Sequence, residues 1–118
     1  MLALTGTPQI FLYRQTTDLR KSFDGLAGLV QAHFGERLYT GGFFVFVNRR
    51  RTLVKILYWD RDGLSIWMKR LERGQFLLPT AVSGPTIELS VAQLTLLLEG
   101  ITPLRQNRRY RRPAAASG

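Results

Sequence analysis

The chain has 118 residues, and its 17 lysines and arginines against 8 aspartates and glutamates give a formal net charge of +9. With 45% hydrophobic residues, this length supports one core and leaves too little for a second independently folding unit. The absence of cysteine excludes disulfides and thiolate metal sites and favours a reducing cytoplasm. The excess positive charge favours a polyanionic partner such as DNA, RNA or an anionic membrane surface.

The first elements in chain order are a short strand and a helix. Residues 9–13 are rich in β-branched and aromatic side chains, which predicts a strand. Before it, residues 1–13 show no basic segment followed by a long apolar core, so we expect no signal peptide or anchor. Thr17 or Asp18 can cap the following helix, which we expect to end at Gly35. Its apolar residues recur at spacings of three and four and are Leu19, Phe23, Leu26, Val30 and Phe34.

From residue 42 onward the pattern predicts a strand meander. Runs of apolar and aromatic residues at 42–47, 52–59, 64–69 and 75–78 are separated by polar breaks. The break at 60–63 carries turn residues, with Gly63 free to adopt positive φ, so Trp59 should face Leu64 across a hairpin. The break at 48–51 should form a second hairpin turn.

The last predicted elements are a loop over 79–85, a short strand over 86–89 and a helix that Ser90 caps and Gly100 ends. We expect residues 1–104 to form a single α+β domain, an antiparallel meander of about four to five strands flanked by two helices. Residues 105–118 hold five arginines and no acid, and this composition predicts a basic, disordered tail.

The meander places the basic residues at one end of the sheet. If Trp59 faces Leu64, antiparallel pairing brings Leu53 near Arg70 and Val54 near Lys69. The turn at 49–51 then lies beside residues 69–73, and the acidic break at 60–62 lies at the opposite end. This arrangement favours a phosphate-binding surface, although a solvated basic turn would show the same pattern. The residues that we expect to contact DNA are Arg49, Arg50, Arg51, Lys69, Arg70 and Arg73 in the domain, and Arg105, Arg108, Arg109, Arg111 and Arg112 in the tail.

Most of the basic residues are arginines, whose planar guanidinium suits phosphate and guanine recognition. Codon usage in a GC-rich genome would produce the same bias without any function. Tyr58, Trp59 and Trp67 are candidate stacking platforms for unpaired bases, but aromatic residues on paired strands more often belong to the core.

No set of residues predicts a catalytic or metal site. Asp60 and Asp62 form a close acidic pair, but metal-dependent phosphoryl chemistry requires further converging carboxylates, and aspartate is common in turns before glycine. His33 is the single histidine and has no partner visible in the sequence. We therefore expect no enzyme activity, no cofactor and no metal.

Several segments together resemble a known family. They are residues 17–26 (TDLRKSFDGL), 44–51 (FVFVNRRR), 55–63 (KILYWDRDG) and 69–76 (KRLERGQF). In order and spacing they are similar to TnpB, the second-open-reading-frame accessory protein of IS66-family insertion sequences, over roughly residues 8–104. Where that family usually has Trp-Pro, this chain has Leu77-Leu78-Pro79.

The resemblance implies a bacterial mobile-element protein that is needed for transposition beside a separate DDE-type transposase. It supplies no catalytic residues. Two hypotheses follow, a DNA-binding protein that helps the transposase assemble on element ends, and an adaptor that binds the transposase with little DNA contact. An exposed apolar patch around residues 76–78 would favour the adaptor. A small nuclease that depends on Asp60 and Asp62 is a third, weaker hypothesis.

Overall fold

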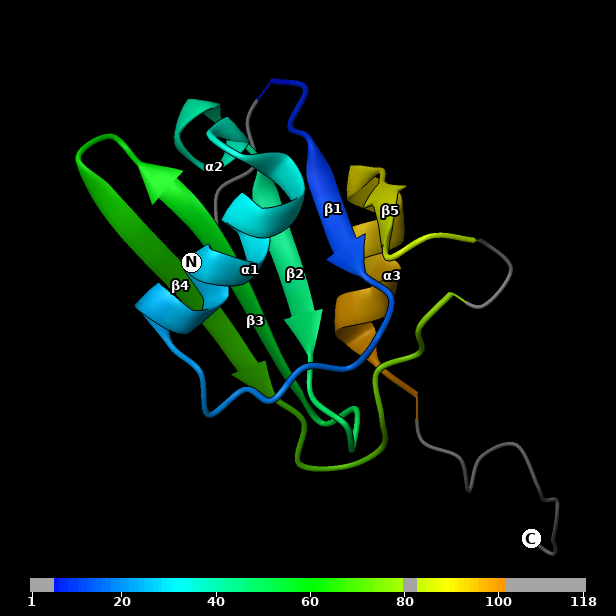
Figure 1. Cartoon of the computed structure of the whole chain (residues 1–118). Coiled ribbons are helices and arrows are strands. Elements are labelled where there is room, and N and C mark those ends of the chain that lie inside the picture. The colour runs from blue at the N-terminus through cyan, green and yellow to red at the C-terminus, as the bar shows by residue number, and fades with distance from the viewer. Residues whose placement is uncertain (1–5, 80–82, 102–118) are drawn as a thin grey trace, which may run out of the picture.

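A computed structural model describes residues 6–79 and 83–101 of the chain. Five strands form one mixed sheet in the spatial order β4-β3-β2-β1-β5 (Figure 1). The strands are β1 (Ile10–Tyr13), β2 (Phe43–Val47), β3 (Leu53–Asp60), β4 (Gly63–Arg70) and β5 (Thr86–Leu89). The helices are α1 (Phe23–Phe34), α2 (Arg37–Thr40) and α3 (Val91–Glu99). The predicted α+β class and strand number are confirmed.

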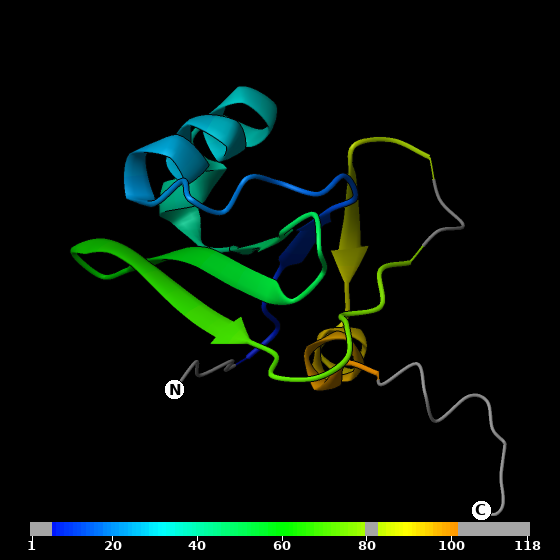
Figure 2. The same cartoon turned by 90° about the horizontal axis from the view of Figure 1, so that it is seen from below.

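The sheet lies between two helical layers, with α1 and α2 on one face and α3 on the other (Figure 2). Each face carries its own apolar cluster, because successive side chains of a strand point to opposite faces. The α1 face buries Phe11, Phe44 and Phe46 against Leu26 and Val30 of α1. The opposite face buries the alternate strand residues against α3; its members include Ile10, Leu12, Val45, Ile56, Phe76, Leu94 and Leu97.

The predicted meander is confirmed from β2 to β4. In the antiparallel β3–β4 pair Trp59 lies opposite Leu64, and Leu53 lies opposite Arg70. The turn between these strands differs from expectation, because Arg61 with φ of 58°, and not Gly63, adopts the left-handed conformation. The Trp59 indole Nε1 donates to the Arg61 carbonyl at 3.0 Å and supports that conformation.

The sheet is not antiparallel throughout, since β1 and β2 pair in parallel. Two parallel neighbours require a crossover connection, and α1 and α2 provide it. The predicted helix therefore connects the two halves of the sheet. A second helix in this connection, α2, was not predicted.

The first helix begins later than predicted. Helix α1 starts at Phe23 after Ser22, whereas Asp18 belongs to the preceding loop, where its carboxylate accepts from the Arg20 backbone N–H at 3.0 Å. The backbone N–H of Thr17 donates to the Val47 carbonyl at 2.8 Å, which ties this loop to the end of β2. The helix ends at Gly35, as predicted.

The predicted strand at 75–78 is wrong. Gln75 forms only an isolated bridge with Ile101, while Phe76 and Leu78 insert into the core on the α3 side. The alternating pattern arose because a loop that covers a sheet can also bury every second side chain. The next predictions are confirmed, since β5 spans Thr86–Leu89 and Ser90 caps α3 through a complete capping box with Gln93.

Within the described ranges, no helix has the length and apolar character needed to cross a membrane. Residues 80–82, part of the predicted loop over 79–85, lie outside those ranges.

Candidate nucleic-acid interface

The turn between β2 and β3 presents three consecutive arginines, Arg49, Arg50 and Arg51, all exposed. Asn48 fixes the turn, because its side-chain oxygen accepts from the backbone N–H groups of Thr52 at 2.9 Å and Leu53 at 3.0 Å. Arg51 has φ of 60°, a left-handed conformation that is uncommon for a non-glycine residue. The predicted hairpin turn is thus present and ordered by its first residue.

The loop that follows β4 binds the outer side of this turn. The Phe76 backbone N–H donates to the Arg51 carbonyl at 2.7 Å, and the Gln75 side chain donates to the Arg50 carbonyl at 2.9 Å. Because Phe76 is almost fully buried, these bonds attach the turn to the core. The guanidinium groups therefore project from a fixed backbone, which lowers the entropy lost when an anion binds.

The second half of the predicted surface comes from the end of β4. The register places Lys69 opposite Val54 and Arg70 opposite Leu53, beside the arginine turn. Arg70 forms an ion pair with Glu72 at 3.4 Å, but both side chains are largely exposed, so the pair is weak. Arg73 is exposed three residues later.

Lys69 differs from the arginines around it. Its Nζ donates to the Leu98 carbonyl in the last turn of α3 at 2.8 Å. A cation at the carboxyl end of a helix is favoured by the helix dipole. This amine thus stabilises the contact between β4 and α3, a role that the sequence did not reveal.

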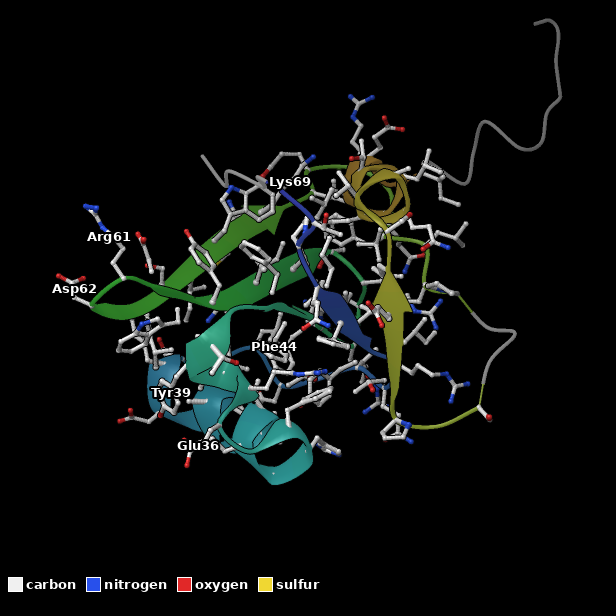
Figure 3. The ribbon with its side chains drawn as sticks, turned by 90° about the horizontal axis from the view of Figure 1, so that it is seen from above. Glu36, Tyr39, Phe44, Arg61, Asp62 and Lys69 are labelled. Carbon is white, nitrogen blue, oxygen red and sulfur yellow. The ribbon has the colours of Figure 1, made fainter. Side chains whose placement is uncertain are left out.

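We call the exposed Arg49, Arg50, Arg51, Arg70 and Arg73 the basic end of the sheet. Among the residues that the structure describes, only Arg70 of this group takes part in an ion pair. Asp60 and Asp62 lie at the opposite end, on the hairpin between β3 and β4. Figure 3 shows Asp62 at one end of the β3–β4 hairpin and Lys69, which precedes Arg70, at the other. The predicted separation of charge is therefore present.

A groove that sequence reasoning missed adjoins the basic end. It has a volume of about 690 Å³ and lies between the loop at residues 16–20 and the turn at 48–50. Arg49 and Arg50 line one side, and Asp18 and Arg20 line the other. The contact of Asp18 with Arg20 at 2.6 Å holds the pKa of the Asp18 carboxyl well below its usual range. Because Arg20 balances this carboxylate, the charge of the groove remains positive.

A second groove of about 630 Å³ continues around the same loop, sharing residues 16–18 with the first. Arg14, Lys21 and His33 contribute to its lining. The Tyr13 hydroxyl donates to the Leu29 carbonyl at 2.9 Å, and burial raises the pKa of Tyr13 to about 12. His33 stands beside this hydroxyl at 3.4 Å, so the histidine is part of a packed contact between β1 and α1. The feature of the sequence that could have indicated these grooves is the pair of adjacent basic residues Arg20 and Lys21, one of which lines each groove.

The candidate stacking residues are largely occupied by packing. Tyr58 and Trp67 pack against the apolar cluster on the α3 face, and the Trp59 ring meets Tyr39 edge to face at 5.3 Å between centroids. In the described part of the chain, no three residues among histidines, aspartates and glutamates gather as a metal site would require. The predicted tail contacts, Arg105, Arg108, Arg109, Arg111 and Arg112, lie outside the described residues.

Comparison with known proteins assigns the family. Residues 8–108 match the family described as IS66 Orf2 like protein. The chain is 41% identical over 101 residues to the uncharacterized protein y4hO of Sinorhizobium fredii, covering 86% of this chain and 87% of that one. It is 31% identical over 101 residues to the uncharacterized protein y4jC of the same organism, covering 86% of each. No solved structure matches. The resemblance noted from the motifs is thus confirmed, and the chain belongs to the IS66 Orf2-like family of insertion-sequence accessory proteins.

Proposed function

We propose that this accessory protein binds DNA without cutting it and thereby assists the separate DDE-type transposase of its element. The observation that carries the proposal is the ordered arginine turn, with Arg49, Arg50 and Arg51 exposed on a backbone fixed by Asn48. Arginine guanidinium groups bind phosphate oxygens through two parallel hydrogen bonds, and a fixed turn presents them together.

The adjoining groove extends the same surface. A phosphate that enters this groove would meet the guanidinium groups of Arg49 and Arg50 on one side and the hydroxyls of Thr16 and Thr17 on the other, where Arg20 neutralises Asp18. Arg70 and Arg73 add charge from the end of β4, and the five tail arginines supply a second contact. Contacts of this kind reach the DNA backbone, so we expect affinity that varies little with base sequence.

The test measures DNA affinity against salt concentration by gel shift, with element-end DNA and scrambled DNA. Each neutralised phosphate contributes about −0.9 to the slope of log affinity against log salt. Replacing Arg49, Arg50 and Arg51 together by glutamate should therefore reduce the slope by about 2 to 3 and weaken binding to both DNAs alike. A flat slope for the unaltered chain would refute the proposal.

The chain offers a matched control for a single substitution. Arg51 and Arg61 are both exposed turn residues with φ near 60°, but only Arg51 lies at the basic end. R51E should weaken DNA binding several-fold more than R61E, although both change the net charge equally. Equal effects would show that only the net charge matters and that the basic end is not the binding surface.

A second candidate function is that of an adaptor for the transposase. An apolar groove of about 400 Å³ lies between α3 and residues 77–79, and two of its lining residues are largely exposed, Leu77 by 60% and Leu96 by 68%. This is the patch that the adaptor hypothesis requires. If the adaptor function is the main one, the triple arginine variant should still bind the transposase in a pull-down, whereas L77D and L96D should lose it.

A further inference from the structure

Strand β4 forms one edge of the sheet, and its outer side has no partner strand within the described residues (Figure 1). The register fixes which groups point outward. The Leu71 backbone N–H donates to the Thr52 carbonyl at 2.8 Å, so the odd-numbered residues of β4 bond to β3. The backbone groups of Leu64, Ile66, Met68 and Arg70 therefore point away from the sheet.

This edge lacks three features that commonly prevent strand pairing, namely proline, a bulge and short length, and its charged residues, Lys69 and Arg70, lie at one end only. Its eight residues contain no proline, and the pairing with β3 is continuous, without a bulge. The other edge strand, β5, has only four residues, and a short edge pairs weakly. Met68, on the free edge, is 59% exposed although it is a large apolar residue. The long edge is therefore able to accept another strand.

The charges at its two ends are complementary. Arg70 lies at one end of β4, and Asp62 lies in the turn before the other end. In an antiparallel pair of two β4 strands, the basic end of each strand would meet the acidic end of the other. A partner strand without one basic and one acidic end would leave Arg70 or Asp62 without an opposite charge. The charge pattern of β4 therefore favours a second copy of the chain as the partner.

We propose that two copies of this chain associate through β4 in an antiparallel pair centred on Ile66. This register joins the outward-pointing groups in about six backbone hydrogen bonds. It places Met68 opposite Leu64 of the second copy, which covers the exposed side chain, and Arg70 opposite Asp62. The two sheets then form one continuous sheet, and the two basic ends lie on opposite sides of the two-fold axis.

Sedimentation of the full-length chain tests the association, with a charge swap as the variant set. The unaltered chain should form a concentration-dependent dimer at about 0.15 M salt. R70D and D62R each oppose like charges twice in the dimer and should weaken it roughly tenfold. The combined D62R and R70D variant should restore the dimer to within about threefold. Circular dichroism confirms that each variant is folded.

The matched control is R73D, which makes the same charge change at an exposed residue outside β4. R73D should leave the dimer unchanged while lowering DNA affinity as R70D does. The two measurements therefore distinguish a failure of the DNA-binding proposal from a failure of the proposed strand pairing. A monomer at all concentrations, single swaps without effect, or a folded double variant that stays monomeric would each overturn the proposed pairing.

The register has its own test, because the natural chain contains no cysteine. In the proposed pair, the two copies of residue 66 lie about 5.5 Å apart between Cα atoms, within reach of a disulfide. I66C should therefore form a covalent dimer under mild oxidation. M68C should not, since its two copies lie about 14 Å apart along the strands. The reverse result would overturn the register.

Discussion

The two turns of the β2–β3–β4 meander differ in how they are held. Both contain an arginine in the left-handed conformation, Arg51 in one and Arg61 in the other. The basic turn is fixed by Asn48 from within and by residues 75–76 from outside. The acidic turn is supported by one side-chain bond, from Trp59. More side-chain hydrogen bonds therefore hold the basic turn, which we propose to be functional, than hold the acidic turn.

The largest effect is expected where the basic turn meets the core. F76A should lower the free energy of unfolding by about 3–5 kcal/mol, because a fully buried aromatic side chain is lost and a cavity remains. L64A, beside the acidic turn, should cost clearly less, since Leu64 is only partly buried. Urea denaturation measures both, and equal losses would contradict the asymmetry between the turns.

Asn48 provides a more selective change. N48A removes the acceptor for two backbone N–H groups and should lower the free energy of unfolding by about 2 kcal/mol. N48D keeps that acceptor and serves as the control, with a smaller loss. DNA affinity should follow the same order, because the arginines of N48A project from a looser turn. If N48A retained full affinity, the order of the turn would be irrelevant to binding.

Variants of Lys69 and Arg70 distinguish a residue that stabilises the fold from a residue that we expect to bind DNA. K69M removes the bond to the Leu98 carbonyl and should destabilise the fold by about 1 kcal/mol. R70M should have little effect on stability, because its ion pair with Glu72 is exposed. Thermal denaturation of the two variants side by side checks the difference. A larger loss in R70M would show that the assignment of the two roles is wrong.

The smallest effect comes from the turn conformations themselves. Glycine adopts positive φ without the strain of a Cβ atom, so R61G should raise the free energy of unfolding by up to about 1 kcal/mol. R51G should do the same and weaken DNA binding, whereas R61G should leave binding nearly unchanged. Destabilisation by R51G would mean that the Arg51 side chain stabilises the turn through packing.

The features that could be predicted from the sequence are those set by residues close together along the chain. The hairpin register from Trp59 and Leu64, the Ser90 cap and the end of α1 at Gly35 follow from local turn and capping chemistry. The parallel pairing of β1 with β2 could not be predicted in this way, because it joins strands separated by two helices. The role of Lys69 was missed for the same reason, since its partner Leu98 is 29 residues away.

The basic end also lies beside the last described residue. Ile101 bridges to Gln75, whose side chain bonds to the arginine turn, so the last described residue is anchored beside Arg50. Arg105, the first of the five tail arginines, follows Ile101 by four residues in the sequence. A linkage this short gives a second contact to the same ligand an effective concentration in the millimolar range. If both sets of arginines bind DNA as we propose, a strand that leaves the first set would meet the second before it could diffuse away.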